Sequence, residues 1–148
     1  MSKSEAEEYT IDSYYRGQDF YHGTSAENAD GITTTGAKWG FNSENSYGDG
    51  FYMSPDKITA IDYAKDSQDP IVLSARVRSR NPRIFQNGTD FYEFLAQYEI
   101  PAEENDAGFS AKILILGGYD AIEIRGIQTL VIILNSQQIA VFNYERTT

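Results

Sequence analysis

The stretch GFYMSPDKITAIDYA, residues 50–64, contains the clearest helix pattern of the chain, directly after a strand pattern. GFYMS is typical of a short strand, because aromatic and other large apolar residues favour strands and a glycine precedes them. In the helix that follows, Ser54 is expected as the N-cap, Pro55 suits the first helical position, and Asp56 lies near the positive end of the helix dipole. The sequence therefore predicts a strand that runs directly into a helix.

On either side of this stretch, strand and helix patterns alternate, and the last strands gather at the C-terminal end. Strands are expected at residues 18–24, 70–77, 119–124, 129–135 and 138–144. Helices are expected at residues 25–36, with Ser25 as N-cap and Gly36 as terminator, and at residues 89–98 and 106–118. Residues 37–50 have the composition of a polar loop. This order indicates an α+β fold and argues against a doubly wound sheet.

The chain has 148 residues, of which 41% are hydrophobic and 23% charged, as in an ordinary globular protein. This length suits one domain with a real core, and the sequence contains no repeat or linker that would indicate a second one. Residues 1–17 are polar and acidic, and we expect them to be a flexible leader. A single domain is expected over residues 18–148.

The formal net charge of −10 restricts the partners that the surface can attract. It repels phosphate backbones and anionic membranes, so nucleic acid is disfavoured and a protein or small-molecule partner is favoured. The arginine-rich run RVRSRNPR, residues 76–83, is expected to form the solvated face of a strand. No apolar run is long enough to span a membrane, and the start of the chain is not a signal peptide, so a cytoplasmic location is expected.

Most common catalytic and metal-binding signatures are absent from the sequence. There is no cysteine, which excludes disulfides and thiolate zinc sites, and the only histidine is His22. A site with two histidine ligands is therefore impossible, and no metal is expected. The sequence also contains no nucleophile elbow and no phosphate-binding loop with its lysine. Eleven tyrosines favour a groove lined by half-exposed rings.

Three separated pieces remain, and together they resemble a known family. They are FYHGTS at residues 20–25, GDGFYMSPDKITAIDYA at residues 48–64, and LVIILNSQQIAVF at residues 130–142. Their order and spacing resemble the ADP-ribosyltransferases, in the His-Tyr-Glu branch that poly(ADP-ribose) polymerases share with diphtheria toxin. The similarity covers residues 19–145. It implies a fold of split, strongly bent antiparallel sheets flanked by short helices, and NAD as co-substrate.

The resemblance implies a role for each matching residue. His22 would donate a hydrogen bond to the 2′-hydroxyl of the adenosine ribose of NAD. Gly23 would bind the nicotinamide carboxamide through its peptide N–H and C=O, where a side chain would block the approach. Tyr52 and Tyr63 would hold the nicotinamide ring between them, which suits a cationic ring that departs from a developing oxocarbenium ion.

Further contacts with NAD follow from the same resemblance. Thr24 and Ser54 are assigned to NAD binding. The family often has a serine three residues before Tyr63 to bond the carboxamide, and here that position is Ala60. The substitution removes one expected contact.

The third position of the triad departs from the family. The glutamate position falls on Leu130, which cannot stabilise the positive charge of the transition state. Gln128, two residues earlier and expected on the same strand face, could supply the hydrogen bond without the charge. Glu123 and Gln138 are alternatives. A triad without glutamate resembles the members that transfer a single ADP-ribose.

The resemblance therefore implies a mono-ADP-ribosyltransferase that moves ADP-ribose from NAD to a protein acceptor and releases nicotinamide. A small acidic domain of this kind would suit a bacterial or phage effector that acts, like a toxin, inside a cell. Two other interpretations remain open. One is a catalytically inactive domain of the same fold that binds NAD, ADP-ribose or a protein. The other is an NAD hydrolase, in which water takes the place of the acceptor.

Overall fold

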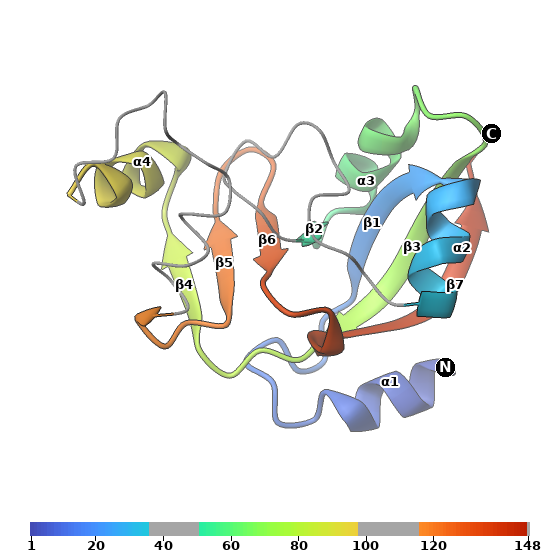
Figure 1. The fold of residues 1–148 in the computed structure, drawn as a ribbon, viewed down its shortest axis with the longest axis horizontal. Helices are drawn as coiled ribbons and strands as arrows, with labels where there is room; N and C mark the ends of the chain where they lie inside the picture. Colours follow the sequence, from blue (N-terminus) through green and yellow to red (C-terminus); the bar gives the residue numbers. More distant parts are fainter. Residues whose placement is uncertain (36–50, 98–115, 148) are drawn as a thin grey trace.

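The computed structural model describes residues 1–35, 51–97 and 116–147, which form a mixed α+β fold (Figure 1). Its elements are α1 (Lys3–Tyr9), β1 (Phe20–Ser25), α2 (Ala26–Thr35), β2 (Phe51–Met53), α3 (Lys57–Ala64), β3 (Pro70–Val77), β4 (Pro82–Phe85), α4 (Gly88–Ala96), β5 (Ala121–Ile124), β6 (Leu130–Ile133), a short 3₁₀ helix (Ser136–Gln138) and β7 (Ile139–Arg146). Gly36, the polar loop expected at residues 37–50 and most of the helix expected at residues 106–118 lie outside the described residues.

The described strands form two open sheets. One has the order β1-β3-β7 with all neighbours antiparallel, and the other has the order β2-β6-β5-β4. In the second sheet β4 pairs with β5 in parallel, and the other pairs are antiparallel. The predicted α+β class is confirmed. The expectation of purely antiparallel sheets is wrong at β4, a short strand that the sequence pattern does not reveal because it begins with a proline and an arginine.

The two sheets meet where β1 passes the end of β2. The peptide N–H of Tyr21 donates to the carbonyl of Ser54 at 2.8 Å, and the N–H of Ser54 donates to the carbonyl of Tyr21 at 2.9 Å. Figure 1 shows α3 and α2 beside the first sheet and α4 at the far edge of the second. This pair of hydrogen bonds brings β1, β2 and the start of α3 to one place.

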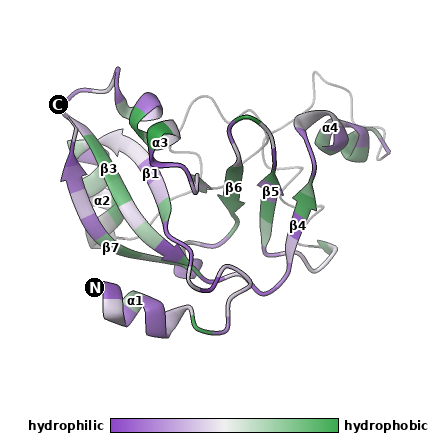
Figure 2. Ribbon diagram, turned by 180° about the vertical axis from the view of Figure 1, so that it is seen from behind, coloured by the Kyte–Doolittle hydropathy of each residue, from purple (hydrophilic) through white to green (hydrophobic). Residues whose placement is uncertain are grey.

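Alternation along the strands of the second sheet divides the core into two clusters. Phe51, Val131 and Ile133 face the cluster shared with the first sheet, whereas Tyr52 and Ile132 face the cluster that α4 covers. Both faces of this sheet are therefore buried, which explains why β5 and β6 read as almost continuous apolar runs. Figure 2 shows hydrophobic colouring on β5 and β6 and on parts of β3 and β7, while α1 is largely hydrophilic.

Residues 1–17 are part of the folded domain and not the flexible leader that we expect from their composition. Helix α1 begins with a capping box between Ser2 and Glu5, and Ala6 is fully buried. The Ser13 hydroxyl donates to the carbonyl of Val77 at 2.7 Å. The hydroxyl of the buried Tyr15 donates to Glu123 on β5 at 2.9 Å. These contacts join the segment to both sheets, and local composition does not reveal them.

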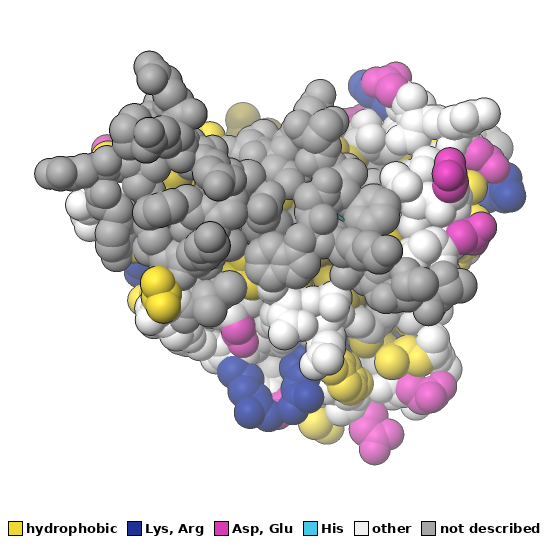
Figure 3. Space-filling model, viewed as in Figure 1, with side chains coloured by type: hydrophobic (Ala, Val, Ile, Leu, Met, Phe, Trp, Pro, Cys, Tyr) yellow, Lys and Arg dark blue, Asp and Glu magenta, His cyan; other side chains and the backbone are white. Residues whose placement is uncertain are grey.

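The arginines of residues 76–83 do not simply form a solvated face. Arg76 is buried and donates to Asp19 at 2.5 Å, because a buried guanidinium requires a partner. Arg78 and Arg80 both pair with Asp12. Figure 3 shows a dark-blue group of Lys and Arg side chains at the lower edge of the molecule. Carboxylates of residues 7–19 therefore compensate Arg76, Arg78 and Arg80.

Helix α3 begins two residues later than the sequence predicts. Its N-cap is Asp56, whose carboxylate accepts from the N–H of Ile58 at 3.0 Å. The hydroxyl of Ser54, the predicted N-cap, instead accepts from the N–H of Asp56 at 3.1 Å and donates to the carbonyl of Thr129 at 2.9 Å. Because serine and aspartate are both good caps, the choice depends on the contact with Thr129.

We expect Tyr15→Phe to lower the free energy of unfolding by about 1–3 kcal/mol, because it removes a donor from the buried Glu123 carboxylate. The matched control is Tyr14→Phe, since this neighbouring ring is 57% exposed and its loss of a hydroxyl should change stability by less than about 0.5 kcal/mol. Urea unfolding of both variants measures the difference. Equal stability of the two variants would contradict the attachment of the N-terminal segment through Tyr15.

Candidate functional site

A narrow cleft, partly open to solvent, lies where β1, β2, α3 and β6 meet, and its volume of about 10 Å³ gives room for about one water molecule. It is lined by Tyr21, His22, Gly23, Tyr52, Met53, Ser54, Thr59, Ala60, Tyr63 and Leu130. The residues that the sequence predicts as a site therefore come together from three separated stretches of the chain. The structure brings His22, Gly23, Tyr52, Tyr63 and Ser54 to one cleft, together with Leu130 at the third triad position.

His22 is positioned by the alternation of β1, which buries Phe20, His22 and Thr24 on one face. Its Nδ1 lies 2.6 Å from the carbonyl oxygen of Tyr52. Its ring stacks on Phe51, with the centroids 4.0 Å apart and an angle of 30° between the planes. The imidazole is therefore held by the backbone of one neighbouring residue and by the ring of another.

Burial determines the charge of His22. The side chain is only 5% exposed, and desolvation lowers its pKa from 6.5 to about 4, although the hydrogen bond to Tyr52 partly opposes this shift. The ring is therefore neutral at pH 7. A carbonyl can only accept, so the single proton resides on Nδ1 and Nε2 carries a lone pair. At neutral pH the free nitrogen of His22 accepts hydrogen bonds, whereas the resemblance implies a donor.

Gly23 presents its peptide groups to the cleft. The N–H and C=O of Tyr21 point away from β3, because they bond to Ser54. Backbone groups two residues apart on a strand point the same way, so those of Gly23 also point away from β3, on the side of β1 where Ser54 pairs with Tyr21. A Cβ at Gly23 would lie 1.9 Å from the carbonyl oxygen of Ala60. Close packing against α3 thus requires glycine here, independently of any ligand.

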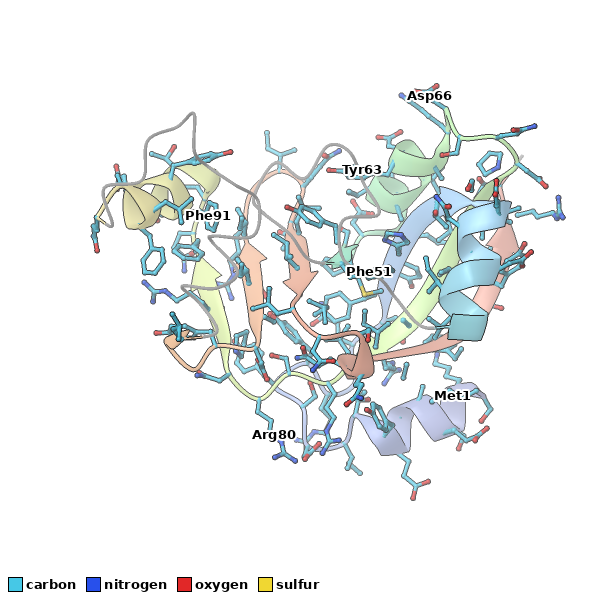
Figure 4. The ribbon with its side chains drawn as sticks, in the orientation of Figure 1. Met1, Phe51, Tyr63, Asp66, Arg80 and Phe91 are labelled. Carbon is cyan, nitrogen blue, oxygen red and sulfur yellow. The ribbon has the colours of Figure 1, made fainter. Side chains whose placement is uncertain are left out.

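Tyr52 and Tyr63 contribute two rings to the cleft that differ in their exposure to solvent. Tyr52 is 8% exposed and belongs to the apolar cluster under α4, so the core fixes its position. Tyr63 is 48% exposed on α3. Figure 4 shows Phe51 between the two sheets and Tyr63 on α3. The cleft therefore has one ring fixed by the core and one ring at its solvent side.

Thr24 and Ser54, the two other residues assigned to NAD binding, differ in where they lie relative to the cleft. Thr24 is buried on the same strand face as His22 but does not line the cleft. Ser54 lines the cleft, and its hydroxyl already donates to Thr129. Ser54 therefore supports the junction of α3 with β6 more directly than it offers a free donor.

Leu130, the position at which the resemblance would place a glutamate, lines the cleft and is 9% exposed. Gln128 lies in the turn between β5 and β6 and is exposed. Its predicted place on the β6 strand is wrong, because β6 begins at Leu130. Its role in catalysis stays a prediction.

The two alternatives for this position lie elsewhere. Glu123 pairs with Val131 across β5 and β6, and its carboxylate bonds to Tyr15 and to Arg125, at 2.6 Å for the latter, on the face that contacts the first sheet. Gln138 donates to the carbonyl of Arg78 at 2.9 Å. Neither lines the cleft, so among the described lining residues the side chain at the glutamate position is an apolar one.

Thr59, which lines the cleft, and Phe51, which stacks on His22 without lining the cleft, are two residues that the sequence does not single out. Thr59 lines the cleft from the first turn of α3, and Phe51 supports His22 from behind. Strand alternation places Phe51 opposite to Tyr52, which indicates a core residue and gives no sign of a contact with a histidine. Only the three-dimensional structure shows that Phe51 and His22 are in contact.

No described helix is long and apolar enough to cross a membrane. Within residues 1–35, 51–97 and 116–147, no three His, Cys, Asp or Glu side chains are grouped so as to hold a metal ion. The residues that line the cleft provide aromatic rings, peptide groups and one neutral imidazole.

No model of a known protein family matches this sequence, and no curated protein is similar enough to count as a relative. The function has to be argued from the cleft itself.

We expect Gly23→Ala to be strongly destabilising, by at least about 2 kcal/mol, because the added carbon would collide with the backbone of Ala60 and neither β1 nor α3 can shift without losing packing. Gly31→Ala in α2 is the matched control. No heavy atom lies within 4 Å of its added Cβ, and alanine favours the helix by about 0.5–1 kcal/mol. Thermal or urea unfolding compares the two, and equal effects would contradict the close approach.

The burial of His22 predicts a specific dependence of stability on pH. Between pH 6.5 and about 4 the unfolded chain binds a proton at His22 that the folded chain excludes, so stability falls as the pH falls through this window. The full shift corresponds to about 3 kcal/mol. Urea unfolding of wild type and His22→Gln across this range isolates the effect, because the carboxylates titrate in both. Parallel curves would refute the burial of a neutral ring.

Proposed function

We propose that this chain is a mono-ADP-ribosyltransferase that transfers ADP-ribose from NAD to a protein acceptor and releases nicotinamide. The observation that carries the proposal is the convergence of His22, Gly23, Tyr52 and Tyr63 on one cleft. These residues come from separate pieces of the sequence, and the resemblance assigns all four to the binding of NAD. A set of unrelated core residues has no reason to meet in one solvent-open cleft.

The peptide groups of Gly23 support a site for the nicotinamide carboxamide. A carboxamide has one acceptor oxygen and a donor NH₂, and it matches a strand edge that offers an N–H and a C=O side by side. The flat ring attached to it would lie between Tyr52 and Tyr63. Because the positively charged pyridinium of NAD is attracted to aromatic faces, the slot suits the reacting end of the dinucleotide.

His22 would orient the ribose of the adenosine half. A ribose hydroxyl can donate to the lone pair on Nε2, so the neutral ring serves this role as an acceptor and not as the donor first expected. The hydrogen bond between His22 and the ribose can form in this reversed direction because a hydroxyl can donate as well as accept.

In the proposed reaction the bond between the nicotinamide nitrogen and C1′ of its ribose breaks, and the electron pair leaves with nicotinamide. An oxygen of the acceptor then forms the new bond to C1′, and its proton passes to solvent. The chain contributes orientation and two π-faces beside the departing ring. Leu130 adds no charge, which supports a single transfer rather than chain elongation.

Leu130 also favours a second candidate function, a domain that binds NAD, ADP-ribose or a protein without catalysis. No carboxylate among the described lining residues stabilises the cation that forms at C1′. An NAD hydrolase would use the same cleft with water as acceptor. The net charge of −10 argues against a nucleic-acid acceptor. A protein acceptor in the cytoplasm of the producing or a host cell, as for a bacterial or phage effector, is part of this proposal.

The test is nicotinamide release from NAD, with and without cell lysate, for the wild type, His22→Ala and Tyr63→Ala. We expect release that depends on lysate and falls at least about 100-fold in both variants, since each removes a contact that orients the reacting dinucleotide. Tyr92→Ala on α4 is the matched control for Tyr63→Ala. The two tyrosines are 47% and 48% exposed, so the substitutions should perturb folding equally, but only one lies at the cleft.

Each outcome separates the candidates. Release without lysate would indicate a hydrolase or self-modification. NAD binding on calorimetry without release would favour the binding domain. Activity that survives both His22→Ala and Tyr63→Ala would refute the assignment of the cleft.

A further inference from the structure

A groove with the volume of a small-molecule site lies on the other face of β6 from the candidate cleft. Strand alternation turns Leu130 toward the cleft and Val131 toward the groove. The groove is partly open to solvent, and its volume of about 410 Å³ falls in the range of pockets that hold small ligands. One of its walls comes from residues 14–18 of the N-terminal segment, and the other comes from residues 125–129 between β5 and β6.

The groove contains an ion pair between Glu123 and Arg125. Glu123 is only 7% exposed, and its two carboxylate oxygens accept from the Tyr15 hydroxyl at 2.9 Å and from Nε of Arg125 at 2.6 Å. Burial and the neighbouring carboxylate raise the pKa of Tyr15, so its hydroxyl stays protonated and remains a donor. The carboxylate is therefore held from two sides, and it in turn holds the guanidinium.

The outer edge of the Arg125 guanidinium is left for solvent or a ligand. Among the described residues, none accepts a hydrogen bond from Nη1 or Nη2, and the side chain is 45% exposed. The main chain is fixed as well, because the N–H of Arg125 donates to the carbonyl of Phe85 at 3.0 Å. Since Nε is bound to a buried carboxylate, the two remaining nitrogens are presented in one orientation.

Aromatic rings line the same groove. Tyr14 is 57% exposed and stands edge-on to Tyr15, with the ring centroids 5.0 Å apart, and Tyr15 stands edge-on to the buried Phe20 at 5.1 Å. The inner two rings belong to the packed interior, whereas Tyr14 keeps much of its ring in solvent. An exposed ring of this kind can cover the apolar part of a ligand whose charged end meets Arg125.

We propose that this groove binds a small organic monoanion, namely a carboxylate attached to an aromatic or other flat apolar group. The carboxylate accepts hydrogen bonds from Nη1 and Nη2 of Arg125, and the apolar group lies against Tyr14. Glu123 is a positioning residue that acts through Arg125. The site is separate from the candidate cleft, and the proposal does not depend on the proposed transfer reaction.

The charges of the groove favour a carboxylate over a phosphate. A carboxylate is planar and matches the edge of a guanidinium in a bidentate pair. Among the residues that line the groove, Arg125 is the only cation and Glu123 the only anion. A phosphate with almost two negative charges is therefore repelled by Glu123 without meeting a second cation. We expect inorganic phosphate to bind at least about 10-fold more weakly than benzoate.

The test is an NMR titration of the intact ¹⁵N-labelled chain with benzoate, and benzyl alcohol serves as a neutral ligand of similar shape. We expect benzoate to shift the Nε signal of Arg125 and the amide signals of Gly126 and Thr129. It should bind at least about 10-fold more tightly than benzyl alcohol, because hydrogen bonds between two charged groups are strong.

Three outcomes of this titration would overturn the proposal. The first is the absence of any shift, and the second is equal binding of benzoate and benzyl alcohol. The third is a set of shifts confined to His22, Gly23 and Tyr63, which would place benzoate in the candidate cleft instead of the groove. Tighter binding of inorganic phosphate than of benzoate would refute the choice of a carboxylate.

The role of Arg125 is tested with Arg125→Lys, which keeps a cation beside Glu123 and so preserves the fold, but removes the planar edge with two nitrogens. We expect benzoate to bind at least about 10-fold more weakly to this variant. Arg146→Lys is the matched control, because Arg146 also donates to a carboxylate, that of Asp69, at 2.6 Å but does not line the groove. Equal binding by both variants would refute the bidentate contact.

The role of the exposed ring is tested with Tyr14→Ala. We expect this variant to bind benzoate about 3- to 10-fold more weakly, since the contact between two rings is lost. Tyr92→Ala on α4 is the control, because Tyr92 is similarly exposed, at 47%, and lies outside the groove. Unchanged binding by Tyr14→Ala would refute the place of the apolar group.

Discussion

The close approach of β1 to α3 is the constraint on which the rest of the site depends. Gly23 leaves so little space that a single added carbon would meet the carbonyl of Ala60. The same strand is joined to the end of β2 by the paired hydrogen bonds between Tyr21 and Ser54. Two contacts, two residues apart on one strand, thus fix the strand that carries His22 against both partners that complete the cleft. A larger residue in place of Gly23 would push β1 and α3 apart and so separate the two sides of the cleft.

The second sheet supports this junction because both of its faces are covered. Phe51 and Tyr52 are neighbours in sequence, yet they face different apolar clusters. One of them therefore reaches His22 from behind, and the other lines the cleft. The arrangement depends on a strand of three residues whose register is set by its pairing with β6. The hydroxyl of Ser54 reinforces this register from the other side by its bond to Thr129.

Patterns of local periodicity predicted the elements that carry their own signals. The strand and helix around residues 50–64 and the apolar strands β3, β5, β6 and β7 are found where the sequence indicates them. His22, Gly23, Tyr52 and Tyr63, the residues to which the family resemblance assigns roles, line one cleft. Elements held by long-range contacts were missed. Helix α1 buries one alanine and is otherwise polar, so its place depends on contacts that composition does not encode.

The errors at the site have a similar physical origin. Ser54 and Asp56 are equally good caps, and only the contact with Thr129 decides between them. The stacking of Phe51 on His22 joins residues from two different sheets, and neither residue signals the other in sequence. The direction of the hydrogen bond at His22 follows from burial, which a residue pattern cannot report. The resemblance indicated which residues to consider, and tertiary packing determines what each of them can do.

The attachment of the N-terminal segment has a consequence for how the domain can be divided. Asp12 compensates both Arg78 and Arg80, and Glu7 lies 3.5 Å from Arg76. A version shortened to residues 18–148 would lose these carboxylates and leave an exposed arginine pair on an otherwise acidic protein. Such a fragment would attract anionic molecules that the intact chain repels. Any minimal form used in a binding assay should therefore keep the first 17 residues, or its affinities will describe a surface that the intact chain does not present.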